Sequence, residues 1–144
     1  MTSPPDLETY RAIFRRAAFI ADLGVELDAV AEGRCETSLG VQPRHLQHSG
    51  QVHAGVLTTL ADHTAGAAAQ TLAPEGMFVA TAEMKISLLR PAKGERLVCR
   101  GRVLKPGRQL SFVEAEVHCV DGGTEHLVAK VSATMAMISQ KNLA

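Results

Sequence analysis

The chain of 144 residues has the size of one domain, and a chain of this length can bury enough apolar surface to form a single core. Lysine plus arginine and aspartate plus glutamate both number 15, so the formal charge is zero and neither nucleic acid nor a membrane surface is an expected partner. Hydrophobic residues make up 46% and aromatic residues 3%, which excludes a disordered chain and a stacking surface for single-stranded nucleic acid. We therefore expect one domain over residues 1–144.

The N-terminal residues carry neither the basic nor the apolar region of a signal peptide, and no stretch approaches the roughly 18 apolar residues of a membrane span. Three widely spaced cysteines without a Cys-x-x-Cys pair fit neither a disulfide framework nor a zinc knuckle. The sequence therefore predicts a cytoplasmic protein with reduced thiols and no association with membranes.

The N-terminal part of the domain, residues 1–24, is predicted to be a helical segment. Apolar residues recur at helical spacing over residues 7–21, which predicts one amphipathic helix that ends near Gly24. Over residues 25–41 the apolar residues alternate instead, with a break in the middle, which predicts two short strands. The polar stretch 43–50 is expected to be a loop.

Residues 54–72 are rich in alanine, leucine, valine and threonine and are apolar nearly all round, which predicts a buried helix about 28 Å long. Alternating apolar residues return at 80–88, and three more such segments follow, punctuated by turns at 105–108 and 121–123. Because such short connections make neighbouring strands antiparallel, we expect an α+β protein. An antiparallel sheet of about six strands is expected to hold the long helix against its concave face.

Asp62 lies in the middle of this apolar helix, and the chain has no lysine or arginine between Arg44 and Lys85. A buried carboxylate without a cation is costly, so Asp62 is a candidate for a functional site. The alternative is that Asp62 faces water or serves a hydrogen bond at an interface.

The start of the same helix is a second candidate, because the backbone N–H groups of Ala54 and Gly55 are expected to point outward without partners. Such a terminus can hold a developing oxyanion, although every helix has one. Ala54 and Asp62 are separated by about 12 Å of axial rise, so they could act on one carbonyl only if a second subunit closed the gap. Gly66, one turn beyond Asp62, leaves room for a substrate or a partner's backbone.

The stretch at residues 47–62 reads QHSGQVHAGVLTTLAD, and it resembles the signature of the hotdog-fold acyl-CoA thioesterases. The resemblance is greatest to the phenylacetate-pathway (PaaI-like) type, allied to the Arthrobacter-type 4-hydroxybenzoyl-CoA thioesterases, which carry His-Gly-Gly at the start of a central helix. Residues 81–92 resemble the strand that follows in this family and its Arg-Pro-Ala turn. The resemblance implies a hotdog fold, hydrolysis of a small aromatic or short- to medium-chain acyl-CoA, and no cofactor.

By this resemblance, Asp62 corresponds to the catalytic acid of the family, which acts as a general base towards water or as a nucleophile that forms a transient anhydride. The backbone N–H of Ala54, helped by Gly55, corresponds to the group that polarises the thioester carbonyl. Ala54 stands where the family usually has the first glycine of its motif, so it adds a methyl group near that carbonyl.

The resemblance also assigns supporting roles. Gln47 corresponds to an Asn or Gln near the thioester or the attacking water, Thr81 to a Ser or Thr near that water, and His53 to the histidine that organises the loop. In the family, the helix terminus and the acid of one site come from different subunits. The resemblance therefore implies a homodimer, and a homotetramer as a dimer of dimers.

His48 and Gly66 are candidate substrate contacts next to these residues. Basic side chains near strand ends are candidate contacts for the phosphates of coenzyme A, although such side chains are more often simply solvated. The basic candidates are Arg90, Lys93, Arg100, Arg102, Lys105 and Arg108.

Three other interpretations are open. The cluster of histidines at His45, His48, His53 and His63 matches no common ligand spacing, so no metal site is expected. A hotdog enoyl-CoA hydratase or dehydratase would pair a histidine with an acid, as His48 and Asp62 could do, although the longer hydratase signature is absent. The third interpretation is a non-catalytic acyl-CoA-binding protein, because Ala54 replaces the glycine that the catalytic members of the family usually have.

Overall fold

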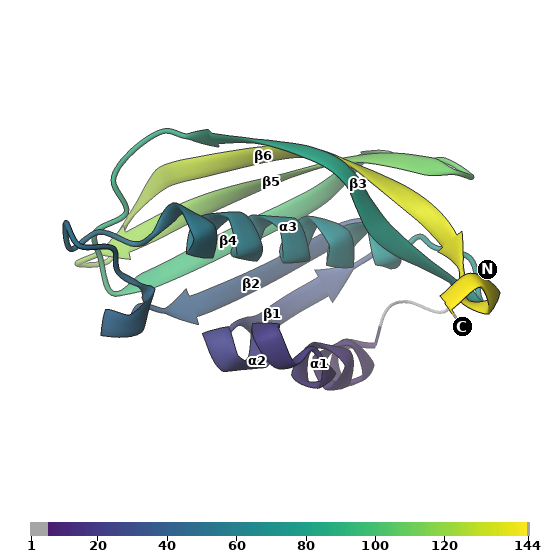
Figure 1. Ribbon diagram of the computed structural model, residues 1–144, viewed down its shortest axis with the longest axis horizontal. Helices are drawn as coiled ribbons and strands as arrows, with labels where there is room; N and C mark the ends of the chain where they lie inside the picture. Colours follow the sequence, from purple (N-terminus) through teal and green to yellow (C-terminus); the bar gives the residue numbers. More distant parts are fainter. Residues whose placement is uncertain (1–5, 144) are drawn as a thin grey trace.

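The computed structural model describes residues 6–143, which form two short helices, a six-stranded sheet and one long helix (Figure 1). The helices are α1 (Leu7–Arg16), α2 (Ala18–Leu23) and α3 (Ala54–Gln70), with 3-10 turns η1 (Pro43–His45) and η2 (Gln140–Leu143). The strands are β1 (Glu26–Ala31), β2 (Arg34–Gly40), β3 (Met77–Leu88), β4 (Arg96–Lys105), β5 (Leu110–Asp121) and β6 (Thr124–Ser139). All neighbouring strands are antiparallel, in the order β1-β2-β4-β5-β6-β3.

The sheet curves around α3, so the predicted α+β architecture of the hotdog type is confirmed (Figure 1). Nine of the 17 residues of α3 are buried, most of them alanine, which is why this stretch is apolar nearly all round. Small residues let the helix approach the sheet closely. At Gly101 of β4, a Cβ atom would lie 3.0 Å from the backbone oxygen of Thr64 in α3, so this contact requires glycine.

The N-terminal segment contains two helices, so the prediction of one continuous helix is wrong. Ala17 has an extended backbone (φ −79°, ψ 93°) and separates α1 from α2, which ends at Gly24 (φ +92°). In one continuous helix, Phe14 and Ile20 would point about 120° apart, because each residue turns the helix by about 100°. The break lets both side chains enter the core, where each is 6% exposed.

Strand β3 is an open edge of the sheet, because within residues 6–143 it pairs with β6 alone. Met84 and Leu88 of β3 lie opposite the buried residues Ala133 and Ala129 of β6, so they point to the same face as the core. They are nevertheless 40% and 54% exposed. A long edge strand with exposed apolar side chains is a surface on which another chain can pair.

The other edge strand, β1, packs against α1. No helix within the described residues combines the length and the hydropathy needed to cross a bilayer.

Candidate active site

The start of α3 presents one free backbone N–H. The ring Nδ1 of His53, the N-cap residue, accepts a hydrogen bond of 2.8 Å from the N–H of Gly55. The expectation that Gly55 offers a free N–H is therefore wrong. The N–H of Ala54 has no hydrogen-bond partner among the described residues, so it is the donor that the positive end of the helix dipole leaves available.

Gly55 is needed for this cap. A Cβ atom at Gly55 would lie 3.0 Å from Nδ1 of His53, closer than the ring can approach without moving. Glycine thus lets the imidazole lie over the first turn of the helix, and the ring fixes the direction of the chain that enters it. His53 caps the helix start, and Gly55 contributes space for the ring.

His45 holds the loop before α3 in place, a role that the sequence did not predict. Its buried ring lies with Nε2 2.8 Å from the carbonyl oxygen of Leu23, and Nδ1 accepts from the N–H of Gln42 at 3.0 Å. The carbonyl of His45 accepts from the N–H of His53 at 2.9 Å. One signal was present in the sequence. His45 lies three residues after Gln42, which is the spacing of a capping box, and Pro43 lies at the first helical position.

A cavity of about 390 Å³ lies at the start of α3. Gln47, His53, Ala54 and Arg90 all line it, so the structure brings these four predicted site residues together. Arg90 follows β3, and its guanidinium donates to the carbonyl of Leu127 at 2.9 Å. The cavity therefore places polar side chains next to the residue that carries the free N–H, Ala54.

Asp62 lies in a different cavity, of about 280 Å³, together with Thr81 and Gly66. The hydroxyl of Thr81 donates to Oδ1 of the half-buried Asp62 at 2.6 Å. No lysine, arginine or histidine forms a salt bridge with Asp62 within residues 6–143. A carboxylate that holds one hydroxyl and no cation has an oxygen available to accept a proton from water.

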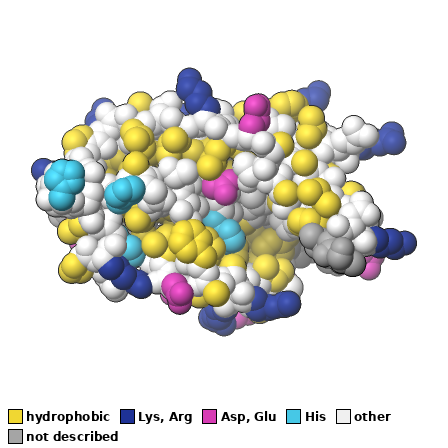
Figure 2. Space-filling view, in the orientation of Figure 1, with side chains coloured by type: hydrophobic (Ala, Val, Ile, Leu, Met, Phe, Trp, Pro, Cys, Tyr) yellow, Lys and Arg dark blue, Asp and Glu magenta, His cyan; other side chains and the backbone are white. Residues whose placement is uncertain are grey.

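The face that carries α3 is largely apolar. Figure 2 shows hydrophobic side chains over much of this face, with lysine and arginine side chains mostly at its margin. Within residues 6–143, the carboxylate of Asp62 accepts the hydroxyl of Thr81 but forms no salt bridge with a cation.

His63 lies beside Asp62 and packs on the N-terminal helix. Its ring stands edge-on to Phe14, with ring centroids 4.4 Å apart, and its Nε2 is buried without a hydrogen-bond partner among the described residues. Burial lowers the pKa of His63 from its ordinary value of 6.5, while the carboxylate of Asp62 opposes this shift. The neutral ring is therefore the form that the folded chain favours.

The pKa of His63 predicts how stability depends on pH. Because the unfolded chain binds a proton at His63 near pH 6.5 and the folded chain resists it, the free energy of unfolding is expected to fall as the pH drops below 6.5. In His63→Gln, urea denaturation over this range should show a weaker dependence on pH. His126→Gln, at an exposed position, is the matched control. Equal pH dependence in all three proteins would contradict the assignment.

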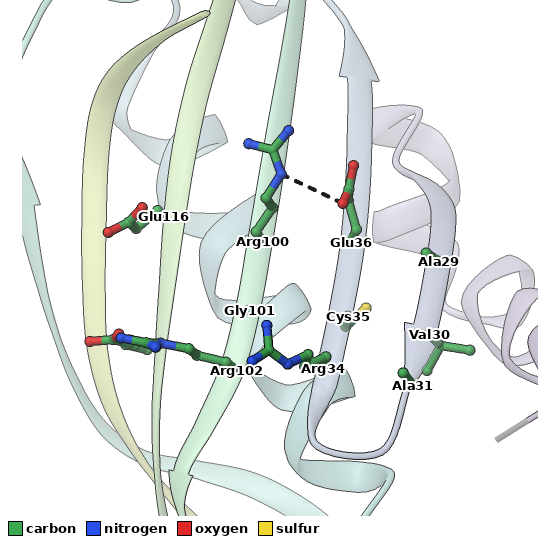
Figure 3. Close-up of a pocket in the computed structure, with 11 residues that line it drawn as sticks. Ala29, Val30, Ala31, Arg34, Cys35, Glu36, Arg100, Gly101, Arg102 and Glu116 are labelled. Atoms are coloured by element: carbon green, nitrogen blue, oxygen red, sulfur yellow. Dashed lines mark hydrogen bonds and ion pairs between the residues drawn. The ribbon is translucent and has the colours of Figure 1, made fainter. Parts of the chain in front are cut away.

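Two of the arginines predicted to contact coenzyme A are paired with glutamates of the sheet. Arg100 makes two hydrogen bonds with Glu125, at 3.0 and 2.9 Å, and Arg102 donates from Nε to Glu114 at 2.6 Å. Both arginines lie on the outer face of the sheet, away from α3, where they line a hollow of about 540 Å³ with Glu116 (Figure 3). Neither Arg100 nor Arg102 lines the cavity of Ala54 or that of Asp62, so one chain does not bring them to the candidate site.

The remaining predicted contacts are not gathered at one site within the chain. Lys93 and His48 are exposed and line neither the Ala54 cavity nor the Asp62 cavity. Lys105 ends β4 and Arg108 follows it, at the end of the sheet that lies away from the start of α3 (Figure 1). Of the basic candidates, Arg90 alone lines the cavity with Ala54.

Known proteins resemble the chain in sequence and in structure. Residues 49–126 match the thioesterase superfamily. The chain superposes with a TM-score of 0.88 on a thioesterase family protein from Silicibacter pomeroyi that is 34% identical, and the match covers 92% of this chain and 97% of the other. A phenylacetic acid degradation-related protein from Ralstonia eutropha is 29% identical, with a TM-score of 0.75 over 85% of this chain and 90% of the other. Human acyl-coenzyme A thioesterase 13 is 29% identical over 112 residues, which are 76% of this chain and 79% of the relative.

Proposed function

The chain belongs to the thioesterase superfamily, and on that premise we propose that it hydrolyses the thioester of a small aromatic or short- to medium-chain acyl-CoA. The observation that carries this proposal is a pair of groups on α3: the N–H of Ala54, which has no partner among the described residues, and the carboxylate of Asp62, which accepts one hydroxyl and no cation. The likeness to human acyl-coenzyme A thioesterase 13 supports an acyl-CoA substrate.

The two groups supply the two needs of thioester hydrolysis. The N–H of Ala54 polarises the carbonyl and stabilises the oxyanion that forms when water adds to the carbon. Asp62 accepts the proton of that water, and the hydroxyl of Thr81 holds Oδ1 so that the other oxygen faces the water. When the tetrahedral intermediate collapses, the carbon–sulfur bond breaks and coenzyme A leaves as a thiolate that takes up a proton. Gln47, which lines the cavity with Ala54, orients the thioester or the water.

One chain does not complete this site, because Ala54 and Asp62 line separate cavities two helical turns apart. A second copy related by a twofold axis brings the Asp62 of one subunit to the helix start of the other. The open edge of β3, with Met84 and Leu88 exposed, is the surface on which such a dimer forms. Two dimers then assemble into a tetramer.

The alternative of a non-catalytic acyl-CoA-binding protein is favoured by one observation, the methyl group of Ala54 in the cavity at the helix start. The hydratase alternative has no such support. His48 is exposed and does not line the cavity of Asp62, so no His–acid pair forms within one chain.

The test is release of free coenzyme A from short, medium, long and aromatic acyl-CoAs, followed with a chromogenic disulfide. The three cysteines of the chain are buried, and burial raises the pKa of Cys35 and of Cys99 to about 12, so the protein's own thiols add little background. We expect release from the aromatic and shorter substrates. Tight binding of acyl-CoA without release would support the non-catalytic alternative instead.

A further inference from the structure

The cavity of Asp62 is closed on one side by helix α1. Tyr10, Ile13 and Phe14 of α1 face Asp62 across this cavity of about 280 Å³. Two contacts fix α1 in place: Nε of Arg11 donates to the carbonyl of Leu27 at 3.1 Å, and the ring of Phe14 packs on His63, which also lines the cavity. The N-terminal helix is thus a wall of the site as well as a cover for β1.

This wall lies outside the residues that match the family model. The thioesterase match spans residues 49–126, which include Asp62 and Thr81 but not α1. The groups proposed for the chemistry therefore come from the shared region, whereas the wall opposite them comes from a segment that the family match does not include. A segment of this kind can change the size of the pocket without changing the chemistry.

Gly66 leaves space on the opposite wall. Glycine in the interior of a helix is less stable than alanine, so it needs a reason. Packing within the described chain provides none, because a Cβ atom at Gly66 would meet no atom within 4 Å. Gly66 lines the cavity of Asp62, so the space that it leaves is space in that cavity.

The far end of the cavity has a fixed polar group. The amide of Gln70 is held by β3: Nε2 donates to the carbonyl of Met77 at 3.1 Å, and Oε1 accepts from the N–H of Val79 at 3.0 Å. Gln70 therefore lines the cavity with its amide fixed in orientation by the strand. Ile13, Phe14, Ala67 and Val79 provide apolar surface around it.

Resting on the proposed function, we propose that the acyl group of the substrate enters the cavity between α1 and α3, and that Ile13 and Gly66 set the largest acyl group that fits. A cavity of about 280 Å³ is at the lower limit for a small-molecule site. Such a cavity suits an aryl or short aliphatic acyl group and excludes a long chain. Ile13 and Gly66 are specificity-determining residues, and neither takes part in the chemistry.

The test is binding of stable coenzyme A thioethers, measured by calorimetry on the full chain: S-butyl-CoA, S-phenacyl-CoA and S-dodecyl-CoA. Gly66→Ala is expected to lower the affinity for S-phenacyl-CoA, relative to that for S-butyl-CoA, by about tenfold, because a methyl group fills part of the cavity. Ile13→Ala is expected to raise the affinity for S-dodecyl-CoA, relative to that for S-butyl-CoA, by about tenfold, because the smaller side chain opens the cavity. Both variants should fold, since Gly66 has free space around it and Ile13 is 51% exposed.

Phe19→Ala is the matched control, because Phe19 is an apolar side chain of α2 that is 66% exposed and does not line the cavity. It should leave all three affinities unchanged. If the affinities relative to S-butyl-CoA were unchanged in Gly66→Ala and Ile13→Ala, this inference would be overturned. It would also be overturned if the wild type bound no thioether. Because thioethers are not hydrolysed, shifted affinities in a protein that releases no thiol from acyl-CoAs would overturn the proposed reaction alone.

Discussion

Replacing Asp62 with asparagine is expected to lower kcat by about 10²-fold or more, because the amide cannot accept the proton of the attacking water. The variant should fold as well as the wild type. Asparagine keeps an oxygen for the hydroxyl of Thr81, which donates to Asp62 at 2.6 Å, and it removes the cost of a half-buried carboxylate without a cation. Steady-state thiol release and urea denaturation, measured on the same preparation, check both expectations.

Asp121→Asn is the matched control for this variant, since Asp121 is an exposed carboxylate in the turn between β5 and β6. Its kcat should stay at the wild-type value. If turnover of Asp62→Asn remained within a few-fold of wild type, Asp62 would have no part in the proton transfer.

Replacing Ala54 with proline is expected to lower kcat by about 10² to 10³-fold, the usual effect of removing one oxyanion donor. Proline removes the backbone N–H and nothing else that the fold uses, because that N–H has no partner among the described residues. Ala54 is the first residue of α3, where proline is favoured, and His53 before it has the extended backbone (φ −64°, ψ 139°) that a following proline requires.

Ala54→Gly is the control, because glycine keeps the N–H and removes only the methyl group. We expect it to retain activity and to accept somewhat bulkier acyl groups than the wild type. Circular dichroism should be the same in both variants, since neither disrupts the helix. Full activity of Ala54→Pro would show that the carbonyl is polarised by some other group.

The two variants together test whether the site is shared between subunits. In a dimer of Ala54→Pro with Asp62→Asn, one of the two shared sites combines an intact helix start with an intact acid. Random mixing after joint refolding should therefore restore about a quarter of wild-type activity, although each variant alone is inactive. The mass in solution should be twice that of the chain or a higher even multiple. A monomer that turns over, or a mixture that stays inactive, would contradict the shared site.

The sequence by itself determined the central helix, the strands and the position of the acid. The strands follow from an apolar period of 2, and α3 follows from a long apolar stretch without proline, which are local properties of the chain. Asp62 was conspicuous because a carboxylate in an apolar helix without nearby cations is unusual in any fold. The family resemblance added Thr81, and its contact with Asp62 at 2.6 Å agrees with that assignment.

Only the tertiary structure decided which groups are free and which are occupied. Arg100 is paired with Glu125, 25 residues further along the chain, and nothing in the sequence predicts this partner. The break at Ala17 and the placement of α1 over the cavity of Asp62 likewise depend on contacts between segments far apart in the chain. Local sequence sets the backbone conformation, but hydrogen-bond partners and cavity walls arise only when distant segments pack together. That is why the sequence indicated the chemistry of the site before it could indicate the shape of its pocket.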